Sequence, residues 1–196
     1  MDEVNAKIWE TFHIKKNDTL PFTPWLPNAD RHTLSVLFSD LGYKKGVEIG
    51  VRMGEHAKDM FDCNPDLELF LVDTWEAYAR ITQEKQDRYY RRCLSNMIGY
   101  KATILKMTSM EALKEVPDES LDFVYIDGNH EFDYAMMDLI MWSKKVRPGG
   151  IVAGHDYCPS PNCDVKQAVN EYVLKNNITR WFLSGGDGSP SFFWRK

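Results

Sequence analysis

Polar side chains that could do chemistry follow five apolar runs of the sequence, each at the point where the run ends. Carboxylate, imidazole and hydroxyl groups can hold cations, accept protons and bind hydroxyl groups. The same residue types are common in ordinary strand-to-helix turns, so one polar run end alone would mean little. Five polar run ends in one chain favour a functional site. They are Glu48 to Gly54, Asp73, Thr108-Ser109, Asp127 to His130 and His155-Asp156.

The apolar runs predict buried strands, and helical patterns alternate with them along the chain. Such alternation is typical of a parallel sheet covered on both faces, whose ligands bind at the carboxyl ends of the strands. The sequence therefore predicts an α/β protein with a Rossmann-like, doubly wound, mostly parallel sheet. We expect strands over 47–51, 67–73, 102–107, 121–127 and 150–156, and helices over 55–61, 84–98, 109–114, 131–145 and 165–175.

The two ends of the chain extend this core. The stretch LPFTPWLP, residues 20–27, predicts an irregular lead-in because of its prolines. A helix follows, capped by Asn28 or Asp30 and ended by Gly42. Near the C-terminus, the runs TRWFLS and SFFWRK predict an antiparallel hairpin. We expect one domain over 1–196, made of an N-terminal lead-in and helix (1–45) and a core (46–196).

Composition limits the class of protein. The chain has 196 residues, of which 43% are apolar and 27% charged, which is typical of a globular protein. Its net charge of −5 disfavours nucleic-acid binding by bulk charge. No apolar run approaches the ~20 residues that cross a bilayer, and the first residues do not resemble a signal peptide. We expect a cytoplasmic protein with reduced cysteines, a small-molecule partner and no nucleic-acid or membrane partner, and leave homo-oligomerisation open.

The turn after the first strand indicates the kind of cofactor. Dinucleotide folds use G-x-G-x-x-G, whose middle glycine lets backbone approach a pyrophosphate. Here Arg52 occupies that position between Gly50 and Gly54, and its side chain would obstruct a pyrophosphate. Asp73, which ends the next strand, could bind both ribose hydroxyls, and Trp75 could stack on adenine. An adenosine without phosphates, bound beside a glycine turn, describes S-adenosylmethionine (SAM).

Four sequence blocks together resemble class I SAM-dependent methyltransferases. They are VEIGVRMGEHA, LVDTW, LDFVYIDGNHEFDYAMMDLIMW and VRPGGIVAGHDY, and the similarity runs from about Gly46 to Tyr172. They are most similar to the small-molecule O-methyltransferase branch that includes macrocin O-methyltransferase and, more distantly, catechol O-methyltransferase. The resemblance implies the class I methyltransferase fold and methyl transfer from SAM to a hydroxyl group, most often of a sugar or glycoside.

The resemblance also implies roles in binding SAM. Glu48 and the glycine backbone would shape the methionine pocket, and His56 at a helix N-terminus would hold the methionine carboxylate. A solvated capping histidine is the alternative for His56. Asp73 would bind the ribose, and Asp127 would lie below the sulfonium. The residues expected to bind SAM are Glu48, Gly50, Arg52, Gly54, His56, Asp73, Thr74, Trp75, Ser109, Met110 and Asp127.

Catalysis is expected between Asp127 and Asp156. Both follow neighbouring strands, so their carboxylates can converge on one divalent ion, Mg²⁺ or Mn²⁺. The relatives have an acid-acid or acid-amide pair where this chain has His155-Asp156, so either His155 is a third ligand or water or Asn129 completes the shell. The resemblance implies that His130 is the general base, with Asp127 beside it. The alternative is that His130 caps the following helix.

Three other functions remain in view. A catechol or phenol could be the acceptor instead of a sugar. A SAM-binding protein without turnover is disfavoured by the intact set of Asp73, Asp127, His130 and Asp156. An NAD-dependent oxidoreductase is disfavoured by Arg52.

Overall fold

The computed structural model describes residues 3–15, 17–26, 28–79, 81–161, 163–186 and 188–196. Within them one eight-stranded sheet has the order β1-β7-β8-β6-β5-β2-β3-β4. The strands are β1 (Trp25–Leu26), β2 (Lys45–Ile49), β3 (Glu68–Asp73), β4 (Lys101–Lys106), β5 (Leu121–Ile126), β6 (Val146–Gly154), β7 (Phe182–Ser184) and β8 (Ser191–Arg195). The helices are α1 (Glu3–Thr11), α2 (Arg31–Asp40), α3 (Glu55–Cys63), α4 (Gln83–Asn96), α5 (Ser109–Ala112), the 3₁₀ turn η1 (Leu113–Glu115), α6 (Phe132–Trp142) and α7 (Val165–Lys175).

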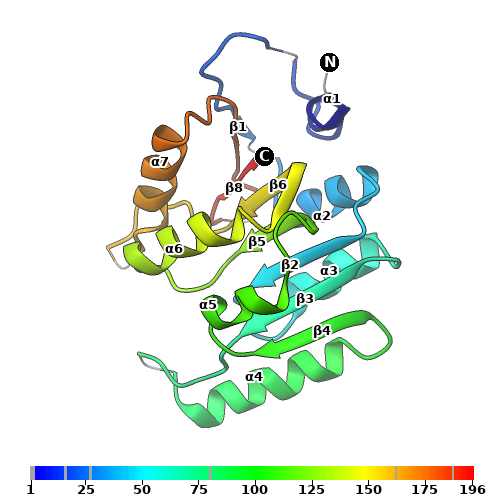
Figure 1. The fold of residues 1–196 in the computed structure, drawn as a ribbon, viewed down its shortest axis with the longest axis vertical. Helices are drawn as coiled ribbons and strands as arrows, with labels where there is room; N and C mark the ends of the chain where they lie inside the picture. The colour runs from blue at the N-terminus through cyan, green and yellow to red at the C-terminus, as the bar shows by residue number, and fades with distance from the viewer. Residues whose placement is uncertain (1–2, 16, 27, 80, 162, 187) are drawn as a thin grey trace.

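The sheet is parallel through its centre and antiparallel at β8. Strands β4, β3, β2, β5 and β6 pair in parallel, as Figure 1 shows by their common direction. Strand β8 runs antiparallel between β6 and β7. The predicted α/β class, the mostly parallel sheet and the C-terminal hairpin are confirmed.

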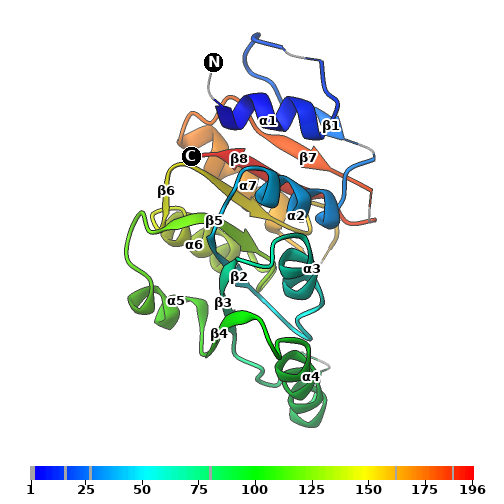
Figure 2. The ribbon, with the colours of Figure 1, turned by 90° about the vertical axis from the view of Figure 1, so that its right-hand side faces the viewer.

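Two hydrophobic layers cover the two faces of the sheet. Side chains alternate between faces along each strand: in β5, Phe123 and Tyr125 join the layer that contains α1 to α4, whereas Val124 and Ile126 join the layer that contains α5 to α7. In Figure 2, α3 and α4 lie on one side of the strands and α5 and α6 on the other. The predicted double winding is therefore confirmed. Among the described residues, every helix is too short or too polar to cross a bilayer.

Local caps explain where several helices begin. Asp30 accepts the backbone N–H of Thr33 at 2.8 Å, and the Thr33 hydroxyl faces the Asp30 backbone N–H, so Asp30 and not Asn28 is the cap of α2. Thr108 and Glu111 form the same arrangement at α5. These caps place the first turns of α2 and α5 at the carboxyl edge of the sheet.

The N-terminal segment departs from the predicted irregular lead-in. Within residues 20–27 it forms a short strand, β1, which pairs in parallel with β7, and the helix α1 precedes it where no element was predicted. Trp9 of α1 packs edge-on against Phe182 of β7, with ring centroids 5.9 Å apart. Both elements pack against β7, which lies far along the chain. Local sequence around the prolines therefore could not predict them. Pro27, part of the predicted lead-in, lies outside the described residues.

Candidate active site

Asp127 and Asp156 lie side by side at the carboxyl edge of the sheet. The hydrogen-bond pattern of the sheet continues past the strand ends, because the Asp127 N–H donates to Ile49 O at 2.8 Å and the His155 N–H to Ile126 O at 2.9 Å. These bonds fix the backbone that carries both carboxylates. The predicted convergence of the two acids is therefore present.

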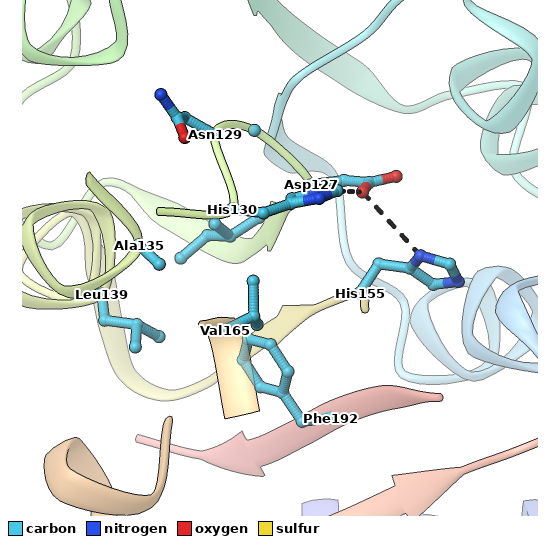
Figure 3. A pocket seen from close by; sticks show the side chains of 10 residues that line it. Asp127, Asn129, His130, Ala135, Leu139, His155, Val165 and Phe192 are labelled. Carbon is cyan, nitrogen blue, oxygen red and sulfur yellow. Dashed lines mark ion pairs between the residues drawn. The ribbon is translucent and has the colours of Figure 1, made fainter. Parts of the chain in front are cut away.

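Two histidines flank the carboxylates, as Figure 3 shows in part. His130 Nε2 lies 3.0 Å from Asp156 Oδ2 and 4.0 Å from Asp127 Oδ1. His155 Nδ1 lies 3.2 Å from Asp156 Oδ1 and 3.8 Å from Asp127 Oδ1. Helix α6 has Glu131 as its N-cap residue, without a side-chain cap. The alternative in which His130 caps that helix is wrong.

Arg31 brings a permanent positive charge to the same cluster. Its Nη1 lies 3.4 Å from Asp127 Oδ2, across 96 positions of sequence. The sequence analysis missed this residue. A signal existed, because Arg31 occupies the first position of α2, where the helix dipole disfavours a cation unless an anion lies nearby.

The charges of the cluster shift the pKa values of its members. The carboxylates of Asp127 and Asp156 raise the pKa of His130 to about 10. The His130 and His155 rings hold the pKa of Asp156 well below its ordinary value. Burial opposes protonation of His155, but the neighbouring carboxylates outweigh it and raise its pKa. At neutral pH the structure therefore holds a protonated His130 in an ion pair with two carboxylates.

The glycine turn after β2 touches the backbone of Asp127. Gly50 has φ +85°, and a Cβ at this position would lie 2.0 Å from the Asp127 carbonyl oxygen. Only glycine fits that close approach and that conformation. The turn predicted to bind the cofactor and the backbone of Asp127 are therefore in direct contact.

A buried pair, Glu48 and His56, lies beneath this turn. His56 Nδ1 and Glu48 Oε1 are 3.0 Å apart, and the exposed fractions of the two side chains are 9% and 3%. The His56 ring also contacts Tyr125, with centroids 4.3 Å apart. Burial raises the pKa of Glu48. The alternative of a solvated capping histidine is wrong; the role of His56 toward a methionine carboxylate stays a prediction.

The Asp73 carboxylate organises the turn from the neighbouring strand end. Its Oδ2 accepts the Arg52 N–H at 2.9 Å, and its Oδ1 accepts the Trp75 N–H at 2.8 Å. The Arg52 side chain turns away, with its guanidinium 5.0 Å from the centre of the Tyr89 ring. The carboxylate itself stays partly exposed beside the glycine turn.

The adenine-stacking role predicted for Trp75 is wrong. The residue is 0% exposed. Its indole N–H donates to Arg52 O at 2.8 Å, and its ring packs on Tyr90. A left-handed backbone at Trp75, with φ +46°, turns the chain so that the indole lies under the loop. Trp75 therefore supports the turn from below instead of facing a ligand.

A hollow of about 340 Å³ lies between the ends of β3 and β4. Thr74 and Thr108 are part of its lining, and Ser109 and Met110, which follow Thr108, are partly buried. Asp138 of α6 is 3% exposed and has the Ser109 hydroxyl as a hydrogen-bond partner, and burial raises its pKa to about 6. Ser109 and Met110, which the resemblance places beside the adenine, follow Thr108 of this lining but are not part of it. The full lining is Thr74, Glu76, Lys106, Met107, Thr108, Glu111 and Lys114.

This arrangement of strand ends has counterparts in known proteins. A family model described as a methyltransferase domain matches residues 47–157, more than half of the chain. The chain belongs to this methyltransferase-domain family. An uncharacterised protein of Sinorhizobium fredii, y4gI, is 30% identical over 90 residues, which are 45% of this chain and 10% of that protein. The match thus spans about a tenth of the length of that relative.

Solved structures share the fold of the methyltransferase domain. An O-methyltransferase from Bacillus cereus, solved in complex with SAH, has a TM-score of 0.63 at 13% identity and covers 98% of this chain and 90% of its own. The O-methyltransferase TomG from Streptomyces achromogenes, involved in tomaymycin synthesis and solved with SAM, has a TM-score of 0.63 at 14% identity, covering 100% and 91%. At these identities the likeness shows the class I methyltransferase fold.

The donor atoms at the edge of the methyltransferase sheet fit a divalent cation. Ligand atoms of Asp127, His130 and Asp156 all lie within 4.8 Å of one another. His155, the predicted third ligand, has Nδ1 directed at the two acids. Asn129 points away in Figure 3 and its Oδ1 accepts the Glu131 N–H at 2.9 Å, so the alternative in which it completes the shell is not supported. A mixed set of imidazole and carboxylate suits Mn²⁺ better than Mg²⁺.

Proposed function

We propose that this methyltransferase domain transfers the methyl group of SAM to a hydroxyl oxygen of a small molecule. The observation that carries the proposal is the contact of the Gly50 turn with Asp127, which joins a cofactor turn to a carboxylate and histidine cluster. Two proteins of the same fold were solved with SAM or with SAH, the S-adenosylhomocysteine that SAM leaves after methyl transfer.

The described residues offer groups for the adenosine and the methionine part of SAM. Asp73 is held by two backbone N–H groups and keeps lone pairs on both oxygens for ribose hydroxyls. The adjoining hollow, bordered by Thr74 and Thr108, has room for a purine ring. We assign the Glu48 carboxylate, held by His56, to the methionine amino group, and Ser109 and Met110 to the border of the adenine.

Replacing Asp73 by alanine should weaken SAM binding by at least about 100-fold. Two hydrogen bonds to a charged carboxylate are lost, each contributing about 1.5–3 kcal/mol, and the Arg52 turn loses an anchor. Calorimetric titration of the purified chain with SAM measures the change. Asp66→Ala is the matched control, since Asp66 is exposed before the opposite end of β3 and should bind SAM as the unchanged chain does. Equal affinity of both variants would remove Asp73 from the site.

Activation of the acceptor falls to the cluster of Asp127, His130 and Asp156. Methyl transfer is an in-line displacement that depends on holding the acceptor oxygen close to the sulfonium carbon. A divalent ion bound by Asp127 and Asp156 would lower the pKa of an acceptor hydroxyl. His130 accepts a proton only in its neutral form.

The ion pair sets a condition on His130 as general base. Because Asp127 and Asp156 hold a proton on the ring, the imidazole becomes neutral near pH 7 only when other positive charge compensates these carboxylates. Arg31 already faces one of them. We propose that His130 is the general base when the divalent ion and the substrates are bound, with Arg31 and Asp127 setting the pKa of its ring.

A sugar or glycoside is the acceptor that we propose first, and a catechol or phenol second. Trp25 and Tyr78 are exposed aromatic side chains on which a sugar ring could stack. The test is methyl transfer from labelled SAM to free sugars, glycosides and catechols, with EDTA and Mn²⁺ or Mg²⁺ arms. We expect labelled glycosides with metal present. Labelled catechols alone would exclude the sugar assignment, and full activity in EDTA would exclude the metal.

A further inference from the structure

A second set of metal-ligand side chains lies on the outer face of α2 and α3. His32 comes from the first turn of α2, and Asp59 and Cys63 are one turn apart on α3. His32 Nδ1 is 2.8 Å from Asp59 Oδ1 and 4.0 Å from Cys63 Sγ. The three ligand atoms all lie within 4.8 Å of one another. This cluster shares no residue with the Asp127 site.

The distances are close to those of a tetrahedral zinc site. Zn–N bonds of about 2.0 Å and Zn–S bonds of about 2.3 Å separate nitrogen from sulfur by about 3.6 Å and nitrogen from oxygen by about 3.3 Å. The His32 ring therefore has to move by only a few tenths of an ångström. Thiolate, imidazole and carboxylate together select zinc-type ions over Mg²⁺, which prefers oxygen ligands.

An unpaired oxygen in the cluster supports a ligand there. Asp59 Oδ2 is buried and has no hydrogen-bond partner among the described residues. Buried polar atoms are nearly always partnered, so such an atom indicates a water or an ion. Lys58 on α3 pairs with Asp62 and not with Asp59. The Asp59 carboxylate pairs with His32 instead.

The same residues do not form a nucleophilic triad. In a triad the two imidazole nitrogens face different partners, whereas here Nδ1 faces both Asp59 and Cys63. Burial, together with the carboxylates of Asp59 and Asp62, raises the pKa of the Cys63 thiol, which opposes its activation as a nucleophile.

We propose that His32, Asp59 and Cys63 bind a zinc-type divalent cation that joins the first turn of α2 to α3. The ion takes the imidazole nitrogen, a carboxylate oxygen and the thiolate, with water as the remaining ligand. Arg31, the neighbour of His32, contacts Asp127, so the ion fixes the turn from which this arginine reaches the active site. The site is structural and goes beyond the proposed methyl transfer.

Cobalt titration of the tag-free, chelator-stripped chain tests the proposal. Co²⁺ bound to a thiolate gives a charge-transfer absorption that oxygen and nitrogen ligands do not give. We expect the band in the unchanged chain, its displacement by Zn²⁺, and its loss in Cys63→Ser and in His32→Gln. His32 is exposed, so the second variant tests the site even if Cys63→Ser unfolds. Far-UV circular dichroism checks that each variant is folded.

Two controls separate this site from the Asp127 cluster. Cys163 Sγ lies 3.3 Å from Asp156 O, so a thiolate near the active site could also bind cobalt. The band should persist in Cys163→Ser and in Asp127→Asn. A band that survives Cys63→Ser, or that disappears in Cys163→Ser, overturns the proposal. So does a band that appears only when Co²⁺ far exceeds the protein, which identifies an adventitious ion only.

Discussion

Replacing Asp127 by asparagine should lower kcat for methyl transfer at least about 100-fold, whereas the Kd for SAM should change only a few-fold. The Asp127 carboxylate faces His130, His155 and Arg31 at once. Asparagine keeps the shape and the backbone bond to Ile49 but removes the charge. The histidines then lose one of the two carboxylates that orient them. Single-turnover rates and calorimetry, with an acceptor found by the screen, measure the two effects separately.

Asp133→Asn is the matched control for this change. Asp133 is exposed in the first turn of α6, a few residues from His130. Its substitution removes the same charge at a position that does not face the cluster. It should retain full activity. If Asp127→Asn also retained activity, the carboxylate would have no part in the reaction. If it abolished SAM binding instead, Asp127 would belong to the cofactor pocket alone.

Replacing Gly50 by alanine should destabilise the chain and abolish SAM binding together. A non-glycine residue at a positive φ costs about 1–3 kcal/mol, and forcing an atom into packed surroundings costs a similar amount. Here the new Cβ would meet the Asp127 carbonyl oxygen at 2.0 Å, so β2 and β5 have to separate at their ends. Each kcal/mol corresponds to about 2–4 °C for a chain of this size, so Tm should fall by roughly 5–20 °C.

Gly99→Ala isolates the backbone term of this prediction. Gly99 has φ +88°, nearly that of Gly50, but a Cβ there would meet nothing within 4 Å. The control variant therefore loses only the stability that the positive φ costs, and it should bind SAM as the unchanged chain does. Equal losses of Tm in the two variants would show that the close contact with Asp127 does not contribute to the destabilisation. Thermal melts followed by circular dichroism give both values.

The core of the fold could be predicted because its signals are local. The runs that form β3 and β5 alternate apolar side chains toward two layers, and short helical patterns separate them. The residues at their ends, such as Asp73 and Asp127, follow from that alternation. Strand β1 could not be predicted in this way, because only its pairing with β7 makes Trp25 and Leu26 a strand.

The site was predictable where backbone topology places a residue and unpredictable where a side chain must choose a direction. Asp127 and Asp156 follow neighbouring parallel strands, so their meeting follows from strand order. From the sequence, the Trp75 side chain could point either toward a ligand or into the protein. Its left-handed backbone turns the side chain into the protein. Arg31 reaches Asp127 from a helix outside the matched family region, and its place at the start of α2 indicates a nearby anion without saying which one.

The pairing of β1 with β7 has a consequence for how the protein folds during synthesis. Residues Trp25 and Leu26 leave the ribosome well before their partners Leu183 and Ser184, because the strands of the parallel sheet core lie between them in sequence. Contacts between distant parts of a chain close slowly, because the intervening loop loses entropy. The segment that leads into α2 is therefore held in place only after the C-terminal hairpin has formed.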